Sequence, residues 1–168
     1  MALYTPVVGI ITEIDHQTGN FNQTPGCNIL YTLQTEGQQG IINFMLQPNA
    51  YVLNLHPFQI GDRATFFYDP NTPVPLIYPP RYQAIAAAYT PHGVTAVLDV
   101  FQSNLVNSDN TLMLTPMWNT PVTLPNGQPF TENAGGNLLL ATYTATTRSI
   151  PARTTPEQIV VFCGNRTN

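Results

Sequence analysis

Glycine and proline divide this chain into segments that are too short for long helices. The 168 residues include 11 glycines and 16 prolines, which recur at short intervals. Between them apolar and polar residues alternate, and a helical period is hard to find. Such alternation is typical of strands that bury one face. The sequence therefore predicts an all-β fold.

The first half of the chain contains five expected strands. The second and third are joined by a tight connection and read as a hairpin. The third and fourth are separated by a longer break at 49–58, which is either one short helical turn or a packed loop. The expected strands cover residues 7–15, 28–37, 40–48, 60–69 and 81–90.

The layout of VVGIITEID, the 28–48 hairpin, IGDRATFFYD and the last strand resembles an OB-fold over residues 7–90. An OB-fold is a five-stranded barrel, and Gly9 inside the first strand suits the sharp bend that a small barrel needs. The resemblance implies a ligand face on the second and third strands, made up of Tyr31, Leu33, Asn43, Phe44 and Met45. The basic residues that accompany oligonucleotide binding are missing from this face.

The second half predicts five further strands without a detectable repeat of the first half. Asn126-Gly127 is a strong hairpin signal within 121–130. We expect residues 1–91 to form the OB-fold-like barrel and residues 92–168 a second, small antiparallel sheet packed against it. Because no long linker separates them, the two parts could also form one compact unit. The further strands are expected at 94–103, 112–118, 121–130, 137–147 and 157–163, with an irregular proline-rich arm at 148–157.

Charged residues are unusually scarce in this chain. They make up 8 % of the residues, against about 25 % in ordinary soluble domains. The five basic residues are all arginines and are scattered, and the net charge is −4. Nucleic-acid binding needs clustered basic residues, so we expect no nucleic-acid partner. A neutral surface of Asn, Gln, Thr and Ser lets neighbouring molecules pack without desolvating many ions.

No catalytic or cofactor motif is found in the sequence. The three histidines, His16, His56 and His92, lie in expected turns without a second ligand at metal-binding spacing. The serines lack a nucleophile-elbow context, and no glycine loop that cradles phosphate precedes a helix. We therefore expect no enzyme activity, no cofactor and no metal.

The N-terminal apolar run, Val7 to Ile11, is too short for a signal peptide or a membrane span. If Met1 is the native start, the chain is not exported by such a signal, and we expect no membrane span. The composition favours an assembly on a cell or spore surface or outside the cell, by a route that the sequence leaves open.

Six residues are candidates for a site. Tyr78, Arg81 and Tyr82 form either a cation–π recognition patch or a structural clasp at the start of a strand, and the strand context favours the clasp. Trp118 is a further candidate for ligand contact or packing. The two cysteines, Cys27 and Cys163, are either reduced thiols or a disulfide, within one chain or between subunits.

Two functions follow from these observations. The first is a non-enzymatic structural protein that assembles with itself into a filament, appendage or coat. Strand edges without lysine are natural templates for strand addition between subunits. The second is a module that binds a neutral polysaccharide, because eight tyrosines, eight phenylalanines and one tryptophan offer stacking faces beside many polar amides.

Overall fold

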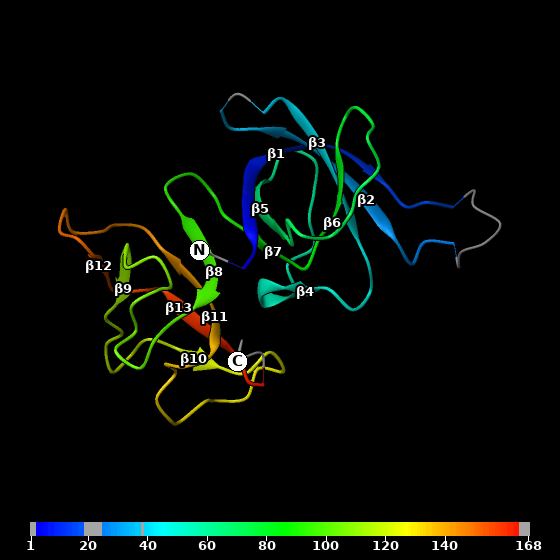
Figure 1. Ribbon diagram of the computed structural model, residues 1–168. Coiled ribbons are helices and arrows are strands. Elements are labelled where there is room, and N and C mark those ends of the chain that lie inside the picture. Colours follow the sequence, from blue (N-terminus) through cyan, green and yellow to red (C-terminus); the bar gives the residue numbers. More distant parts are fainter. Residues whose placement is uncertain (1–2, 19–24, 38, 165–168) are drawn as a thin grey trace. The chain divides into compact units, whose positions relative to one another are not determined.

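The computed structural model describes residues 3–18, 25–37 and 39–164, and it confirms the all-β fold class (Figure 1). Among these residues the one helical element is a 3-10 turn, Leu53–Leu55, in the break expected at 49–58. No helix of the described chain has the length and hydrophobicity needed to cross a membrane. The chain divides into two compact units: a first unit, Tyr4–His92, and a second unit, Gly93–Asn168 with Met1–Leu3.

The first unit contains one mixed sheet of seven strands in the order β4-β7-β5-β1-β2-β3-β6. β1, β2 and β3 are successive antiparallel neighbours, and β5 pairs with β1 in the same sense. β6 pairs with β3 and β4 with β7, both in parallel. The strands are β1 (Thr5–Asp15), β2 (Ile29–Thr35), β3 (Ile41–Leu46), β4 (Tyr51–Val52), β5 (Arg63–Tyr68), β6 (Arg81–Gln83) and β7 (Ala86–Tyr89).

The single closing strand expected at 81–90 is wrong. The segment forms two short strands, and the described strands make a mixed sheet without a closed barrel. The break falls where the backbone changes partner. The amide of Ala84 donates to the carbonyl of Met45 on β3, at 2.9 Å, whereas the amide of Ile85 donates to Phe67 on β5, at 2.8 Å. β6 pairs with β3, and β7 pairs with β5 and β4, so the pairing partners change across Ala84 and Ile85, where the backbone bends.

The alternation in the first three strands places one face of each in the core. Val7 and Ile11 of β1, Leu33 of β2 and Phe44 of β3 are buried. Phe66 of β5 joins them, and its ring lies 5.1 Å from that of Phe44 between centroids. The core of the first unit is therefore aromatic at its centre, with aliphatic side chains around it.

Gly9 is needed for a close approach of β1 to β2. A Cβ atom at this position would lie 2.6 Å from the carbonyl oxygen of Gln34 and 3.1 Å from the Cα atom of Thr35. Both neighbours are backbone atoms of β2 and cannot rotate away. The glycine thus permits the pairing of the two strands, which is a different role from the barrel bend expected from the sequence.

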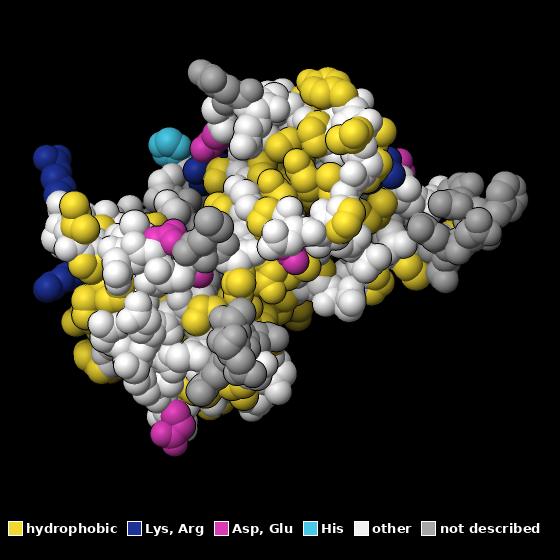
Figure 2. Space-filling view, in the orientation of Figure 1, with side chains coloured by type: hydrophobic (Ala, Val, Ile, Leu, Met, Phe, Trp, Pro, Cys, Tyr) yellow, Lys and Arg dark blue, Asp and Glu magenta, His cyan; other side chains and the backbone are white. Residues whose placement is uncertain are grey.

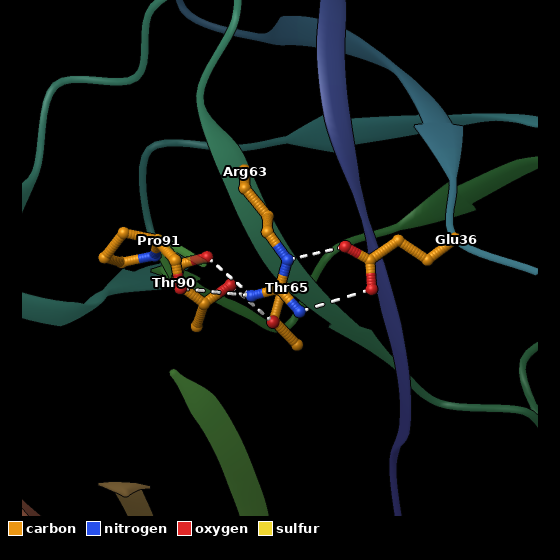
Figure 3. Close-up of polar contacts among 5 residues, drawn as sticks. All are labelled: Glu36, Arg63, Thr65, Thr90 and Pro91. Atoms are coloured by element: carbon orange, nitrogen blue, oxygen red, sulfur yellow. Dashed lines mark hydrogen bonds and ion pairs between the residues drawn. The ribbon is translucent and has the colours of Figure 1, made fainter. Parts of the chain in front are cut away.

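Arg63 connects the ends of three strands of the first unit (Figure 3). Its guanidinium donates to both carboxylate oxygens of Glu36, at 2.6 and 3.2 Å. It also donates to the carbonyls of Thr90, at 2.7 Å, and Pro91, at 3.3 Å. Thr65 reaches the same segment through a hydroxyl–hydroxyl bond of 2.9 Å to Thr90. We interpret this network as structural, because it holds the chain where β2, β5 and β7 begin or end.

The ion pair predicts a pH-dependent stability. The hydrogen bond from Arg63 is the main cause that lowers the pKa of Glu36 below its ordinary value of 4.5. The carboxylate therefore stabilises the fold at pH values above 4.5, and this contribution is lost as the pH falls through the lowered pKa. Because the Glu36 side chain is about half exposed, solvent screens the pair and the effect is at most about 1 kcal/mol.

Urea unfolding of Glu36→Gln and of the parent chain measures this contribution. We expect the variant to be less stable at pH 7 and the difference to shrink at pH values well below 4.5. A difference that is the same at both pH values would show that the charge of Glu36 is not what stabilises the fold.

The second unit also consists of strands, but their arrangement differs from the expected antiparallel sheet. A four-stranded sheet has the order β10-β13-β11-β8, and a separate pair joins β12 to β9. Two of these pairings, β10–β13 and β12–β9, are parallel. The strands are β8 (Thr95–Val100), β9 (Leu112–Leu114), β10 (Val122–Thr123), β11 (Leu138–Tyr143), β12 (Ala152–Thr154) and β13 (Gln158–Phe162).

The irregular arm expected at 148–157 is therefore wrong in its central part. β12 lies inside this segment and pairs residue by residue with β9. The two paired segments lie far apart in the sequence, so no local sequence pattern predicts their pairing. By contrast, the turn at Asn126-Gly127 forms as expected: the amide of Leu124 donates to the carbonyl of Gln128 at 2.8 Å, and Gly127 has a φ of 86°.

Candidate functional site

The three residues of the expected recognition patch belong to the first unit, and the further candidate Trp118 belongs to the second. Arg81 and Tyr82 line one pocket of the first unit, and Tyr78 lies in the preceding loop with 79 % of its surface exposed. Trp118 belongs to the second unit and is 92 % exposed. Among the described residues no ring contact joins Arg81 to a tyrosine, and the choice between a recognition patch and a structural clasp stays a prediction.

The pocket, which we call the Tyr82 pocket, has a volume of about 310 Å³. Its walls come from the start of β2, the end of β3, the end of β5 with the loop that follows it, and β6. The residues that line it are Asn28, Met45, Gln47, Tyr68, Asp69, Thr72, Pro73, Val74, Pro75, Arg81, Tyr82 and Gln83.

Two stacked tyrosines form the aromatic part of the pocket. The rings of Tyr68 and Tyr82 lie 4.0 Å apart between centroids and only 15° from parallel. Phe44 packs behind them, with its centroid 6.1 Å from Tyr68 and 5.9 Å from Tyr82. Burial, with a smaller effect of Tyr82, raises the pKa of Tyr68 above 10.0, so its hydroxyl is neutral at physiological pH. The pair therefore offers a rigid, uncharged aromatic surface.

The polar part of the pocket carries one cation, one carboxylate and three amides. Arg81 and Asp69 supply the opposite charges, and Asn28, Gln47 and Gln83 supply the amides. Arginine only donates hydrogen bonds and a carboxylate only accepts them, whereas an amide does both. The pocket can therefore satisfy a ligand that presents donors and acceptors side by side.

The loop after β5 is shaped by a turn at Asp69. The amide of Asn71 donates to Oδ1 of Asp69 at 2.9 Å, and the amide of Thr72 donates to its carbonyl at 3.2 Å. Pro73 and Pro75 follow, and their rings fix the backbone φ angles. The turn and the two prolines therefore restrict the backbone of this pocket wall.

Beyond the turn, the same loop presents an exposed apolar stretch, which we call the apolar loop (residues 74–78). The exposed fractions are 38 % for Val74, 102 % for Leu76, 50 % for Ile77 and 79 % for Tyr78. Figure 2 shows hydrophobic side chains gathered over the region where Figure 1 draws β3, β6 and the loop before β6. Clustered exposed apolar side chains of this kind mark an interaction surface.

The ligand face implied by the OB-fold resemblance is mostly buried. Tyr31, Leu33 and Phe44 belong to the core and cannot touch a ligand without unfolding. Asn43 accepts a hydrogen bond of 2.7 Å from Thr32 and is only partly exposed. Of the five residues, only Met45 lines the Tyr82 pocket.

The structure reveals one pair that the sequence reasoning missed. His56 Nε2 lies 2.9 Å from Asp62 Oδ2, and the His56 ring stacks on Tyr89 at 4.3 Å between centroids. Asp62 also accepts from the amide of Gln59 at 3.0 Å, within the turn that precedes β5. The turn brings two residues six positions apart together, a spacing that belongs to no recognised motif. The described residues contain no group of three His, Cys, Asp or Glu side chains that could hold a metal.

The buried carboxylate Asp99 is also accounted for by the fold. Its Oδ1 accepts from the amide of Val100 at 2.8 Å, and its Oδ2 accepts from the hydroxyl of Ser108 at 2.7 Å. The loop at 108–110 therefore uses its serine to satisfy a strand carboxylate of the second unit.

Both cysteines are free thiols at the surface. Cys27 and Cys163 are exposed, and no disulfide joins them in the described chain. They belong to different units, Cys27 to the first and Cys163 to the second. The described residues therefore contain no disulfide within one chain, and a cross-link between subunits stays a prediction that non-reducing electrophoresis tests.

Comparison of the chain with protein-family models, with curated proteins and with solved structures finds no match.

Proposed function

We propose that this protein is a non-enzymatic structural subunit that assembles with copies of itself into a filament, appendage or coat at a cell or spore surface. The apolar loop (residues 74–78) carries this proposal. A fully exposed Leu76 beside Ile77 and Tyr78 costs free energy in water, and burial against a second copy recovers about 1.5–3 kcal/mol for each large side chain.

The charge distribution supports a second copy as the partner. Residues 70–80 contain no charged side chain, and few charged side chains appear on the face drawn in Figure 2. Asp69 and Arg81 flank this segment, so two such surfaces meet with the desolvation of few ions, a step that is costly where charges are dense. The second unit adds Met117, Trp118 and Ile150, which are 58, 92 and 93 % exposed.

The sheet edges offer a second kind of contact between copies. β6 and β4 are the outer members of the seven-stranded order, and each is only two or three residues long. β6 lies directly after the loop that carries the apolar side chains, so a copy that docks on the loop also meets a strand edge. Edges this short leave few backbone groups free, so strand addition there would supplement the contact made by the apolar loop and extend the assembly.

We also propose that the first unit has an OB-fold-like strand topology. The pairings support it: β1, β2 and β3 follow one another, β5 returns beside β1, and the segment 81–89 pairs first with β3 and then with β5. A bent last strand of this kind would bring the two sides of a curled sheet together.

Size-exclusion chromatography with negative-stain electron microscopy of the purified chain tests the function. We expect regular particles or fibres that elute well ahead of an 18.5 kDa monomer. A clean monomer at high concentration, with empty grids, would contradict the proposal.

A further inference from the structure

The Tyr82 pocket has a composition that self-assembly does not explain. It shares Val74 and Pro75 with the apolar loop, but it also places a cation, a carboxylate and three amides beside two stacked tyrosines. We propose that the Tyr82 pocket binds one ring of a neutral saccharide.

The aromatic wall suits the apolar face of a sugar ring. The C–H groups on one face of a pyranose carry partial positive charge, and the face of a tyrosine ring carries the negative part of its quadrupole. Tyr68 and Tyr82 are held parallel at 4.0 Å, and Phe44 packs behind them. Such a preformed aromatic surface can stack on a ring without the entropy cost of ordering flexible side chains.

The polar side chains suit the rim of hydroxyl groups around the same ring. Every hydroxyl both donates and accepts, so it can pair with the donor-only Arg81, the acceptor-only Asp69 and the amides of Gln47 and Gln83. One oxygen of Asp69 is engaged by the Asn71 amide, and among the described residues its second oxygen has no partner.

The two opposite charges select against ionic ligands. An anion that approached Arg81 would also meet the carboxylate of Asp69, and a cation that approached Asp69 would meet Arg81. A neutral ligand meets neither repulsion. The volume of about 310 Å³ lies at the lower end for ligand pockets, which fits one ring with the rest of a chain outside.

Isothermal titration calorimetry of the full chain with cellohexaose, maltohexaose and mannohexaose tests the inference. We expect at least one of these neutral hexasaccharides to bind, with one site per chain. Arg81→Gln and Asp69→Asn each remove one charge-assisted hydrogen bond, and we expect each to weaken binding about tenfold or more. Arg153→Gln, an exposed arginine of the second unit, is the matched control and leaves the affinity unchanged.

Asp69→Asn keeps the size of the side chain, and Arg81→Gln changes a residue that is exposed. We therefore expect both variants to retain the fold, which circular dichroism checks. Leu76→Asp changes a residue outside the pocket lining and leaves saccharide binding intact. Loss of self-association and loss of saccharide binding are thus seen separately.

Two results would overturn the inference. One is the absence of binding to all three hexasaccharides, or binding that Arg81→Gln and Asp69→Asn leave unchanged. The other is that a peptide with the sequence of residues 70–80 binds and is weakened by Arg81→Gln while no saccharide binds. The pocket would then receive the loop of a neighbouring copy.

Discussion

Leu76→Asp is expected to weaken self-association by about 100-fold. The leucine side chain is 102 % exposed in the single chain, so its removal takes nothing from the core. In an assembly the variant loses the burial of this leucine, which contributes about 1.5–3 kcal/mol, and the introduced carboxylate has to be desolvated as well. Each 1.4 kcal/mol is a factor of ten in the dissociation constant. Light scattering on a concentration series measures the change.

Ile60→Asp is the matched control for this substitution. Ile60 is also a large exposed aliphatic residue, at 67 %, and it precedes β5, whereas the apolar loop follows the other end of that strand. We expect Ile60→Asp to assemble like the parent chain. Equal weakening by both substitutions would mean that added negative charge, and not the apolar loop, controls the assembly.

Phe66→Ala is expected to destabilise the first unit by about 3–5 kcal/mol, a range typical of a buried phenylalanine. Its ring is fully buried in β5 and lies 5.5 Å from Tyr31, 5.4 Å from Phe58 and 5.1 Å from Phe44 between centroids. Its removal leaves a cavity that these three rings cannot fill without moving together. Urea unfolding followed by circular dichroism measures the loss.

Ile60→Ala serves as the reference for that experiment, because the side chain lies in the same unit but largely in water. We expect it to cost less than about 1 kcal/mol. A loss for Phe66→Ala no larger than this would mean that the aromatic cluster is not the centre of the core.

The strands that depend on local alternation could be predicted from the sequence. β2 and β3 lie within the expected segments, and β1 covers its expected segment but begins earlier, at Thr5. Val7, Ile11, Leu33 and Phe44 follow the period of two that a half-buried strand requires. β5 also lies within its expected segment, although its central residues are buried without alternation. β11 and β13 in the second unit also lie within the expected segments, but their consecutive residues are buried, so a continuous apolar run and not alternation marks them. The Asn126-Gly127 turn is a local signal too.

The features that depend on distant partners could not be predicted in this way. β12 has a proline before it and pairs in parallel with β9, so neither its composition nor its neighbours reveal it. The change of pairing partner at Ala84 and Ile85 depends on the positions of β3 and β5, and these positions cannot be predicted from the alternation within one segment.

The candidate site shows the same division. Arg81 and Tyr82 stood out because of their composition, but the side chains that make a pocket of them come from separate segments. Tyr68 is fourteen residues from Tyr82, and its stacking on that ring follows from the sheet order. His56 and Asp62 meet only through the turn between them.

Sedimentation velocity of the unmodified chain over a dilution series tests the central claim most directly. If the apolar loop joins copies of the protein, the weight-average mass exceeds 18.5 kDa and rises with concentration. A single species of 18.5 kDa at every concentration would contradict self-assembly as the function of this protein.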